Sequence, residues 1–205
     1  MKQSHDPGVG SSVQSGAYNS ALFESFVAGV NRLDAAVGVL DLGPSTPENL
    51  MFWVRCGRDV AAFDLQANEA AERPLPLEGK RFGGILCWNA LSLLPRARAQ
   101  AAVAALHTVL EPGGYLFAIF DGDGRRAPAP VRYHIVSESR LRFEPCEGMP
   151  PGRAVSTSEI ETLMEGLRAT RLTVMRHGSR EALGQIPPAT RAPFPDARGL
   201  RPRAT

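Results

Sequence analysis

Short apolar runs alternate with segments of helical period through the middle of the chain, and this alternation limits the fold more than any other feature. The strand-like runs cover residues 36–42, 59–65, 82–91 and 115–121, and the helical patterns cover 20–33, 47–57, 95–110 and 156–167. Strands that are apolar throughout are buried on both faces, as in parallel sheets covered by helices. The pattern therefore predicts an α/β fold with a mostly parallel sheet between two helical layers.

Local signals mark where several of these elements begin. Thr46 is a suitable N-cap for a helix whose first position is Pro47, a place where proline is favoured. Ser156 or Ser158 precedes a glutamate three residues later, which is the pattern of a capping box. Two strand-like runs within residues 171–186 flank a His-Gly pair, and we expect an antiparallel hairpin there.

Composition excludes several classes of protein. The 205 residues are enough for one substantial core, and a net charge of +2 is too small to indicate binding of nucleic acid. Nearly all basic residues are arginine, which we attribute to a bacterial-like genome composition. Three cysteines without CxxC spacing indicate reduced thiols rather than a disulfide framework or a zinc site. Neither a signal peptide nor a membrane-spanning run is found, so we expect a cytoplasmic protein.

The two ends differ in composition from the middle. Residues 1–16 are rich in glycine and serine and are expected to be disordered, and residues 187–205 resemble a flexible Pro/Arg-rich tail. One domain is therefore expected over residues 17–186. Residues 121–152 form a long insertion before the last helix, and long loops are often functional. The insertion is expected to be a lid, a substrate platform or a partner surface. A protein partner would bind either to the insertion or to the C-terminal tail. The alternative for the tail is that it is simply solvated.

Residues that stand out from the apolar runs gather where those runs end. They are Asp41, Gly43, Ser45, Asp64, Trp88, Asn89 and Asp121. The carboxyl ends of parallel strands share one edge of a sheet, and ligands of such sheets bind at that edge. This convergence predicts a ligand cleft there.

The same segments resemble the motifs of class I S-adenosylmethionine-dependent methyltransferases. The similar strings are VLDLGPSTPENL (39–50), AAFDL (61–65), FGGILCWNALSLLP (82–95) and LHTVLEPGGYLFAIF (106–120). The resemblance extends over about residues 20–186 and implies a three-layer Rossmann-like sheet with an antiparallel strand from the C-terminal hairpin. It also implies S-adenosylmethionine as cofactor. Between Asp64 and Phe82 the chain is too short for the family's usual helix, third strand and helix.

The first motif departs from the glycine-rich pattern of the family. The three glycine positions fall on Gly43, Ser45 and Pro47, of which only the first is glycine. Glycine permits close backbone approach to a ligand, whereas Ser45 adds a hydroxyl and Pro47 lacks an N–H group. The resemblance places Gly43 and Ser45 at the cofactor and Asp41 near its amino acid end. The alternative is a plain strand-turn-helix without a ligand.

The second motif ends in an acid that the resemblance assigns to the cofactor ribose. Asp64, with Leu65 beside it, would accept hydrogen bonds from the ribose hydroxyls; otherwise Asp64 caps the next turn. Trp88 either offers an aromatic face to the cofactor or closes the core.

Candidate catalytic residues are Trp88, Asn89 and His134. An asparagine cannot act as a general base, so the acceptor is expected to be a carboxylate, a thiolate or a neutral amine. His134 follows the fifth predicted strand and either lines the cleft or lies on the surface. No histidine spacing indicates a metal site.

Two functions remain open from the sequence. One is an active methyltransferase with an unknown small-molecule or protein acceptor. The other is a pseudo-enzyme, a catalytically inactive methyltransferase-like protein that serves as a binding or scaffold module. A nicotinamide dehydrogenase is disfavoured because the turn after Asp41 is not GxGxxG.

Overall fold

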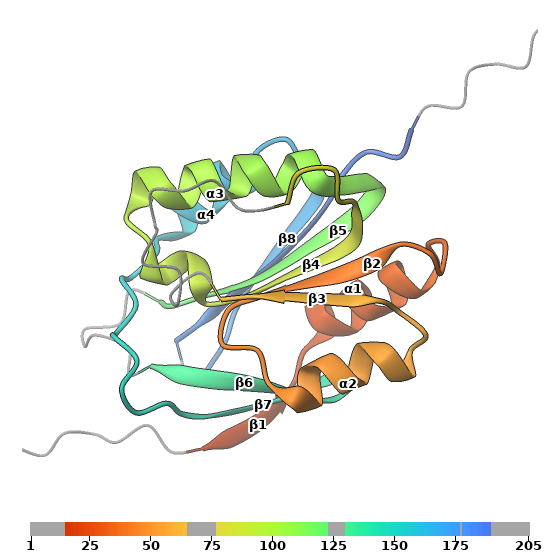
Figure 1. Cartoon of the computed structure of the whole chain (residues 1–205). Coiled ribbons are helices and arrows are strands. Elements are labelled where there is room, and N and C mark those ends of the chain that lie inside the picture. The colour runs from red at the N-terminus through yellow and green to blue at the C-terminus, as the bar shows by residue number, and fades with distance from the viewer. Residues whose placement is uncertain (1–14, 65–76, 123–129, 177, 190–205) are drawn as a thin grey trace, which may run out of the picture.

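A mixed sheet lies at the centre of the computed structural model, which describes residues 15–64, 77–122, 130–176 and 178–189 (Figure 1). In the described part of the chain this sheet has six strands in the order β3-β2-β4-β5-β9-β8. Their bounds are β2 (Gly38–Leu42), β3 (Val60–Phe63), β4 (Phe82–Trp88), β5 (Leu110–Phe120), β8 (Arg168–Val174) and β9 (Arg180–Gln185). Strands β3, β2, β4 and β5 are parallel, and the hairpin β8–β9 adds β9 antiparallel to β5. The expected fold class is confirmed.

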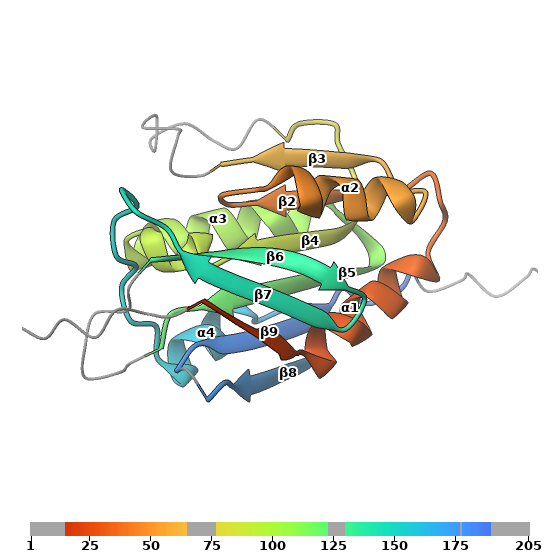
Figure 2. The ribbon, with the colours of Figure 1, turned by 90° about the horizontal axis from the view of Figure 1, so that it is seen from below.

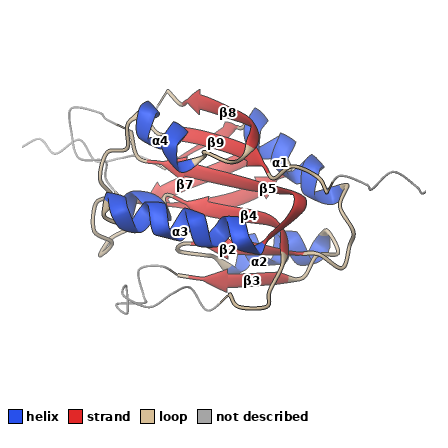
Figure 3. Cartoon of the chain, turned by 90° about the horizontal axis from the view of Figure 1, so that it is seen from above, coloured by secondary structure: helices blue, strands red, loops and turns tan. Residues whose placement is uncertain are grey.

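Helices cover both faces of the sheet, as Figures 1 and 3 show. One face carries α1 (Ala21–Asn31) and α2 (Pro47–Arg55), and the other carries α3 (Arg96–Val109) and α4 (Thr157–Leu163). A short 3-10 helix, η1 (Ala90–Leu93), connects β4 to α3. The strand side chains alternate between two apolar cores, one on each face.

Helix α1 packs closely on the central sheet because a glycine on β4 leaves room for it and a buried arginine bonds to its last carbonyls. Its N-cap Ser20 accepts a hydrogen bond from the backbone N–H of Phe23 at 2.9 Å. A Cβ atom at Gly84 of β4 would come within 2.6 Å of Val30, so only glycine lets the helix approach this closely. The buried Arg58 donates hydrogen bonds to carbonyls at the end of α1, including Val30 at 2.8 Å and Leu33 at 2.9 Å. The Val30 carbonyl also accepts from the Leu33 N–H at 3.0 Å, so Arg58 reinforces the end of the helix.

The insertion folds into a second sheet rather than an irregular loop. Strands β6 (Val131–Ser137) and β7 (Arg140–Pro145) form a hairpin, and β1 (Gly16–Asn19) pairs with β7. Figure 2 shows this sheet on the side of α1 and α2. Asn49 joins helix α2 to this second sheet. Its Nδ2 donates to the Tyr133 carbonyl at 3.0 Å, and its Oδ1 accepts from the Ile135 N–H at 2.8 Å. One amide side chain thus satisfies two backbone groups of β6.

Several expected boundaries agree with the structure and others shift. Thr46 caps α2 with Pro47 at its first position, and Ser156 caps α4 through the N–H of Glu159. Strand β5 begins at Leu110, five residues before the predicted start, because its first residue already pairs with Phe82 of β4.

Parts of the predicted segments lie outside the described residues. Residues 65–76, where the family's third strand would lie, are among them, as are 1–14 and 190–205. The predicted N-terminal segment ends inside β1, whose first residue is Gly16. Within the described ranges, no helix is both long enough and apolar enough to cross a membrane.

Candidate functional site

The predicted strand-end residues meet at one edge of the central sheet. Because β3, β2, β4 and β5 run parallel, the residues at their carboxyl ends share this edge. Asp41 lies in β2 one residue before its end, and Asp64 directly follows β3. Asn89 directly follows β4, and Asp121 directly follows β5. This edge is where ligands of such sheets bind.

The turn after β2 requires glycine at Gly43. Its φ of 132° lies in a region that other residues rarely adopt, and its N–H donates to the carbonyl of Phe63 at 3.1 Å. A Cβ atom at this position would come within 3.1 Å of the backbone oxygen of Trp88. The turn is therefore held between the ends of β3 and β4, and the following helix starts at Pro47 as predicted.

Asp41 is fully buried and only half satisfied. Its Oδ1 accepts hydrogen bonds from the Ser45 hydroxyl and from the Trp88 indole N–H, both at 2.8 Å. Its Oδ2 is buried and has no hydrogen-bond partner. Burial raises the pKa of Asp41 to about 6, although the hydrogen bonds from Ser45 and Trp88 oppose the shift. A buried carboxylate oxygen without a partner is costly, and such groups concentrate at functional sites.

Trp88 lies in the core beneath the second sheet. It is fully buried, and its ring stacks on Tyr133 of β6, with centroids 6.0 Å apart and planes at 18°. Phe23 and Phe117 contact it from other sides, with centroids 6.2 and 6.3 Å away. One face of the indole is thus covered by the insertion, which favours the core role over a contact with the cofactor.

Asn89 combines an unusual backbone conformation with an unsatisfied side chain. Among the described non-glycine residues it alone has a positive φ, 44°. Its Oδ1 is buried without a hydrogen-bond partner, while its side chain hydrogen-bonds to Asp121. Residues held in this left-handed region cost free energy and cluster at active sites.

Asp121 is a carboxylate that sequence reasoning did not select as a catalytic candidate. It is 3% exposed, and burial raises its pKa to about 6 against the effect of the Asn89 hydrogen bond. A Cβ atom at Gly152 would lie 2.0 Å from its Oδ2, so the backbone at the end of the insertion runs directly beside the carboxylate. The signal in the sequence is the acid that ends the apolar run 115–120, which the resemblance did not assign a role.

Of the remaining predicted residues, His134 lies away from the edge, Asp64 lies at it, and Leu65 is outside the described residues. His134 is buried on β6, with its Nε2 2.9 Å from Glu144 Oε1. Successive side chains of a strand point to opposite faces, so His134 points away from the face that Tyr133 turns toward Trp88. Asp64 is half-buried at the end of β3, and Leu65 lies outside the described residues.

The acceptor-rich edge fits a ligand that carries hydrogen-bond donors. Two buried oxygens there, Asp41 Oδ2 and Asn89 Oδ1, lack partners, and Asp64 adds a carboxylate at the neighbouring strand end. A ligand with an ammonium group and hydroxyl groups would complement these acceptors. Within the described ranges, no three His, Cys, Asp or Glu side chains are grouped so that they could hold a metal ion.

Comparison with known proteins identifies the fold. No family model matches the sequence, and no curated protein matches it significantly. Among solved structures, the sugar N-methyltransferase KedS8 from Streptoalloteichus sp. ATCC 53650 is similar, with a TM-score of 0.55 and 17% identity over 90% of this chain and 100% of that one. The CcbJ methyltransferase from Streptomyces caelestis gives a TM-score of 0.54 at 18% identity, covering 80% and 89%.

A third neighbour comes from another organism. It is a SAM-dependent methyltransferase from Methanosarcina mazei, with a TM-score of 0.52 and 15% identity over 77% of this chain and 96% of that chain. At these identities the likeness concerns the fold. The chain therefore has the α/β fold of class I SAM-dependent methyltransferases, as the resemblance implied.

Proposed function

We propose that this protein is a SAM-dependent methyltransferase whose cofactor binds at the carboxyl edge of β2, β3 and β4. The observation that carries the proposal is the pair of buried acceptors without partners, Asp41 Oδ2 and Asn89 Oδ1. Each costs the fold free energy unless a ligand supplies a donor. The methyltransferase fold of the solved neighbours supports the same proposal.

The cofactor would be held by residues from three strand ends. Asp64 would accept hydrogen bonds from the ribose hydroxyls, and Asp41 would accept from the ammonium of the amino acid end. Gly43 keeps the intervening turn in a conformation open only to glycine. When bound, S-adenosylmethionine supplies an electrophilic methyl group on a sulfonium. The chain then has to align the acceptor and to manage its proton.

Asn89 and Asp121 are the residues that we assign to the acceptor. Asn89 cannot take a proton, but its hydrogen bond to Asp121 brings a carboxylate beside it. With a pKa of about 6, Asp121 is mostly ionised at neutral pH and is a stronger base than an ordinary aspartate. An amine fits this pair best, because Asn89 can orient it and Asp121 can accept its proton.

The proposal is tested by calorimetric titration with S-adenosylmethionine and S-adenosylhomocysteine. We expect saturable binding by the wild type and a loss of about 10-fold or more in Asp64→Ala, the range for hydrogen bonds to a charged group. Asp59→Ala is the matched control, because Asp59 is an exposed acid at the other end of β3. Absence of heat at millimolar cofactor would overturn the proposal, as would equal losses in the two variants.

The acceptor assignment has its own test. Under saturating cofactor, methyl transfer to a panel of amines, carboxylates, thiols and hydroxyls is compared between the wild type and Asp121→Asn. We expect transfer to amines by the wild type and a large loss in the variant, with cofactor affinity retained. Efficient wild-type methylation of unactivated hydroxyls would contradict the choice of an amine. Unchanged transfer in Asp121→Asn would contradict the role of that carboxylate.

One observation favours the second candidate, a methyltransferase-like scaffold without activity. Groups that would approach a cofactor contact one another instead: the Ser45 hydroxyl and the Trp88 indole both donate to Asp41, and Gly43 faces the backbone of Trp88. If this closed arrangement persists in solution, the same titration gives no binding. The two candidates are thereby separated by one experiment.

A further inference from the structure

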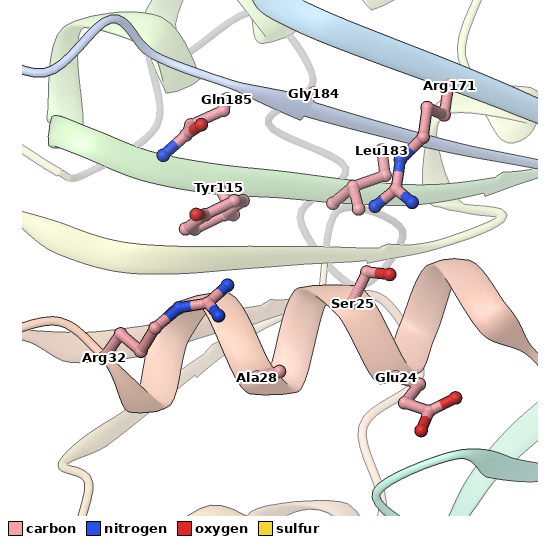
Figure 4. A pocket seen from close by; sticks show the side chains of 9 residues that line it. All are labelled: Glu24, Ser25, Ala28, Arg32, Tyr115, Arg171, Leu183, Gly184 and Gln185. Atoms are coloured by element: carbon pink, nitrogen blue, oxygen red, sulfur yellow. The ribbon is translucent and has the colours of Figure 1, made fainter.

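A concave site lies on the face of the sheet that carries α1, between that helix and the hairpin strands (Figure 4). Its volume is about 480 Å³, within the range of small-molecule sites. The lining residues come from four elements: Glu24, Ser25, Ala28, Arg32, Tyr115, Arg171, Leu183, Gly184 and Gln185. Tyr115 lies in β5 six residues before Asp121, which directly follows that strand. The pocket therefore lies about 20 Å along the strand from the candidate active edge.

The floor of the pocket is fixed by close packing between α1 and β5. A Cβ atom at Gly29 of α1 would come within 2.6 Å of the Tyr115 ring, so the ring lies directly against the helix backbone. Tyr115 pairs with Gln185 of β9, whose Nε2 donates to the Gly113 carbonyl at 3.0 Å. These contacts hold the tyrosine and the glutamine in place without a ligand.

Two arginines extend into the pocket from opposite ends. Figure 4 shows the guanidinium groups of Arg32, after α1, and Arg171, on β8, pointing toward one another across it. In the described part of the chain, neither guanidinium makes a hydrogen bond or an ion pair. Glu24, the acid of the lining, projects from α1 away from the strands in this view. The two positive charges therefore face the pocket without a counter-charge between them.

The free hydrogen-bonding groups of the pocket are mainly donors. The Tyr115 hydroxyl has no partner among the residues that the structure describes. The Ser25 hydroxyl already donates to the carbonyl of Ala21 at 2.8 Å. Two guanidinium groups and one phenol hydroxyl thus remain to bind acceptors. Guanidinium groups favour carboxylate and phosphate, which they hold with two parallel hydrogen bonds.

We propose that this pocket binds a small anion with a carboxylate or phosphate group at each end. Arg171 pairs with Leu183, two residues from Gln185 along β9, which separates the two ends of the pocket by roughly 7 Å at the backbone. One anionic group would bind Arg32 beside the Tyr115 hydroxyl, and the other would bind Arg171. The site is independent of methyl transfer and of the carboxyl edge of the sheet.

The test is titration of the full chain with succinate, glutarate, adipate and pyrophosphate, with acetate and inorganic phosphate as comparisons at constant ionic strength. We expect at least one of the four probes to bind saturably and more tightly than acetate or inorganic phosphate. Arg32→Gln and Arg171→Gln should each weaken that binding by about 10-fold or more, as expected when a charge-assisted contact is lost. Both arginines are exposed, so the melting temperature should not change.

Matched controls are Arg55→Gln, an exposed arginine at the end of α2, and Arg140→Gln, an exposed arginine on β7. Both should bind the preferred two-ended anion as the wild type does. Equal weakening in a control and a pocket variant would show general charge attraction and overturn the proposal. Absence of saturable binding, or acetate or inorganic phosphate bound as tightly as the two-ended anions, would also overturn it. Preference for the dicarboxylates or for pyrophosphate identifies the anionic group.

Discussion

Asp41 reduces the stability of the folded chain at neutral pH. Its carboxylate is fully buried, and one oxygen has no donor. Burial raises the pKa of the folded protein's Asp41 to about 6, above the ordinary value that it has when unfolded. The unfolded state therefore loses its proton first as the pH rises, and stability falls through this range. The proposed contact with the cofactor ammonium would supply the donor that Asp41 Oδ2 lacks.

Asp41→Asn should remove part of this pH dependence. Between about pH 4.5 and 7.5, the free energy of unfolding of the wild type should fall by roughly 1–2 kcal/mol more than that of the variant. Urea denaturation at the two pH values measures the difference. Asp121, whose pKa is also raised, continues to contribute in both proteins. The exposed Asp59→Asn should behave as the wild type, and a fall of equal size in Asp41→Asn would show that this carboxylate is not the source.

At the scale of the elements, α2 connects the two sheets. The Asn49 side chain bonds to the backbone of Tyr133 and of Ile135, as a neighbouring strand would. The placement of β6 in turn sets Tyr133 against Trp88, which donates to Asp41. The helix that begins after the Gly43 turn thereby positions the aromatic layer beside the candidate site.

Asn49→Ala should destabilise the protein by about 2–4 kcal/mol, because it leaves two buried backbone groups without partners. The urea midpoint should fall with an unchanged slope. Asn31→Ala serves as the control, since Asn31 is an exposed helical residue at the end of α1. A loss below about 0.5 kcal/mol, the range of neutral surface changes, would mean that water satisfies β6 and that α2 does not hold it.

At the scale of the whole molecule, β1 attaches the second sheet to the first. Glu181 of β9 is buried and accepts hydrogen bonds from the Tyr18 hydroxyl at 2.9 Å and the Ser20 hydroxyl at 2.7 Å. Burial raises the pKa of Glu181, which these two donors oppose. Residues near the start of the described chain thus bond to a strand near its end.

Truncation distinguishes this attachment from the segments beyond it. A chain of residues 15–189 should melt within about 4 °C of the full chain, because neither removed segment has a periodic apolar face in the sequence. A chain of residues 20–189 lacks β1 and Tyr18, and should melt lower by roughly 4–10 °C, or about 2–3 kcal/mol. Thermal melts of the three proteins measure both effects. Equal melting of the two truncated chains would show that β1 contributes little.

The order of the helices and strands that build the central sheet, and the edge of that sheet where the candidate site lies, could be predicted from the sequence alone. Both depend on local patterns: Thr46 and Ser156 mark helix starts, and Asp41, Asp64 and Asn89 end apolar runs. The periodicity of a strand or helix is written in neighbouring residues, so no tertiary contact is needed to recognise it.

Only the tertiary structure decided how the polar atoms of the site are paired. The indole of Trp88 lies 47 residues from Asp41 in the sequence, and Asn49 lies 84 residues from the carbonyl that it bonds. The second sheet, the bond from Asn89 to Asp121 and the facing arginines of the pocket likewise depend on distant segments. Periodicity records which face of an element is apolar but not which partner meets it. That choice is made by the packing of the whole chain.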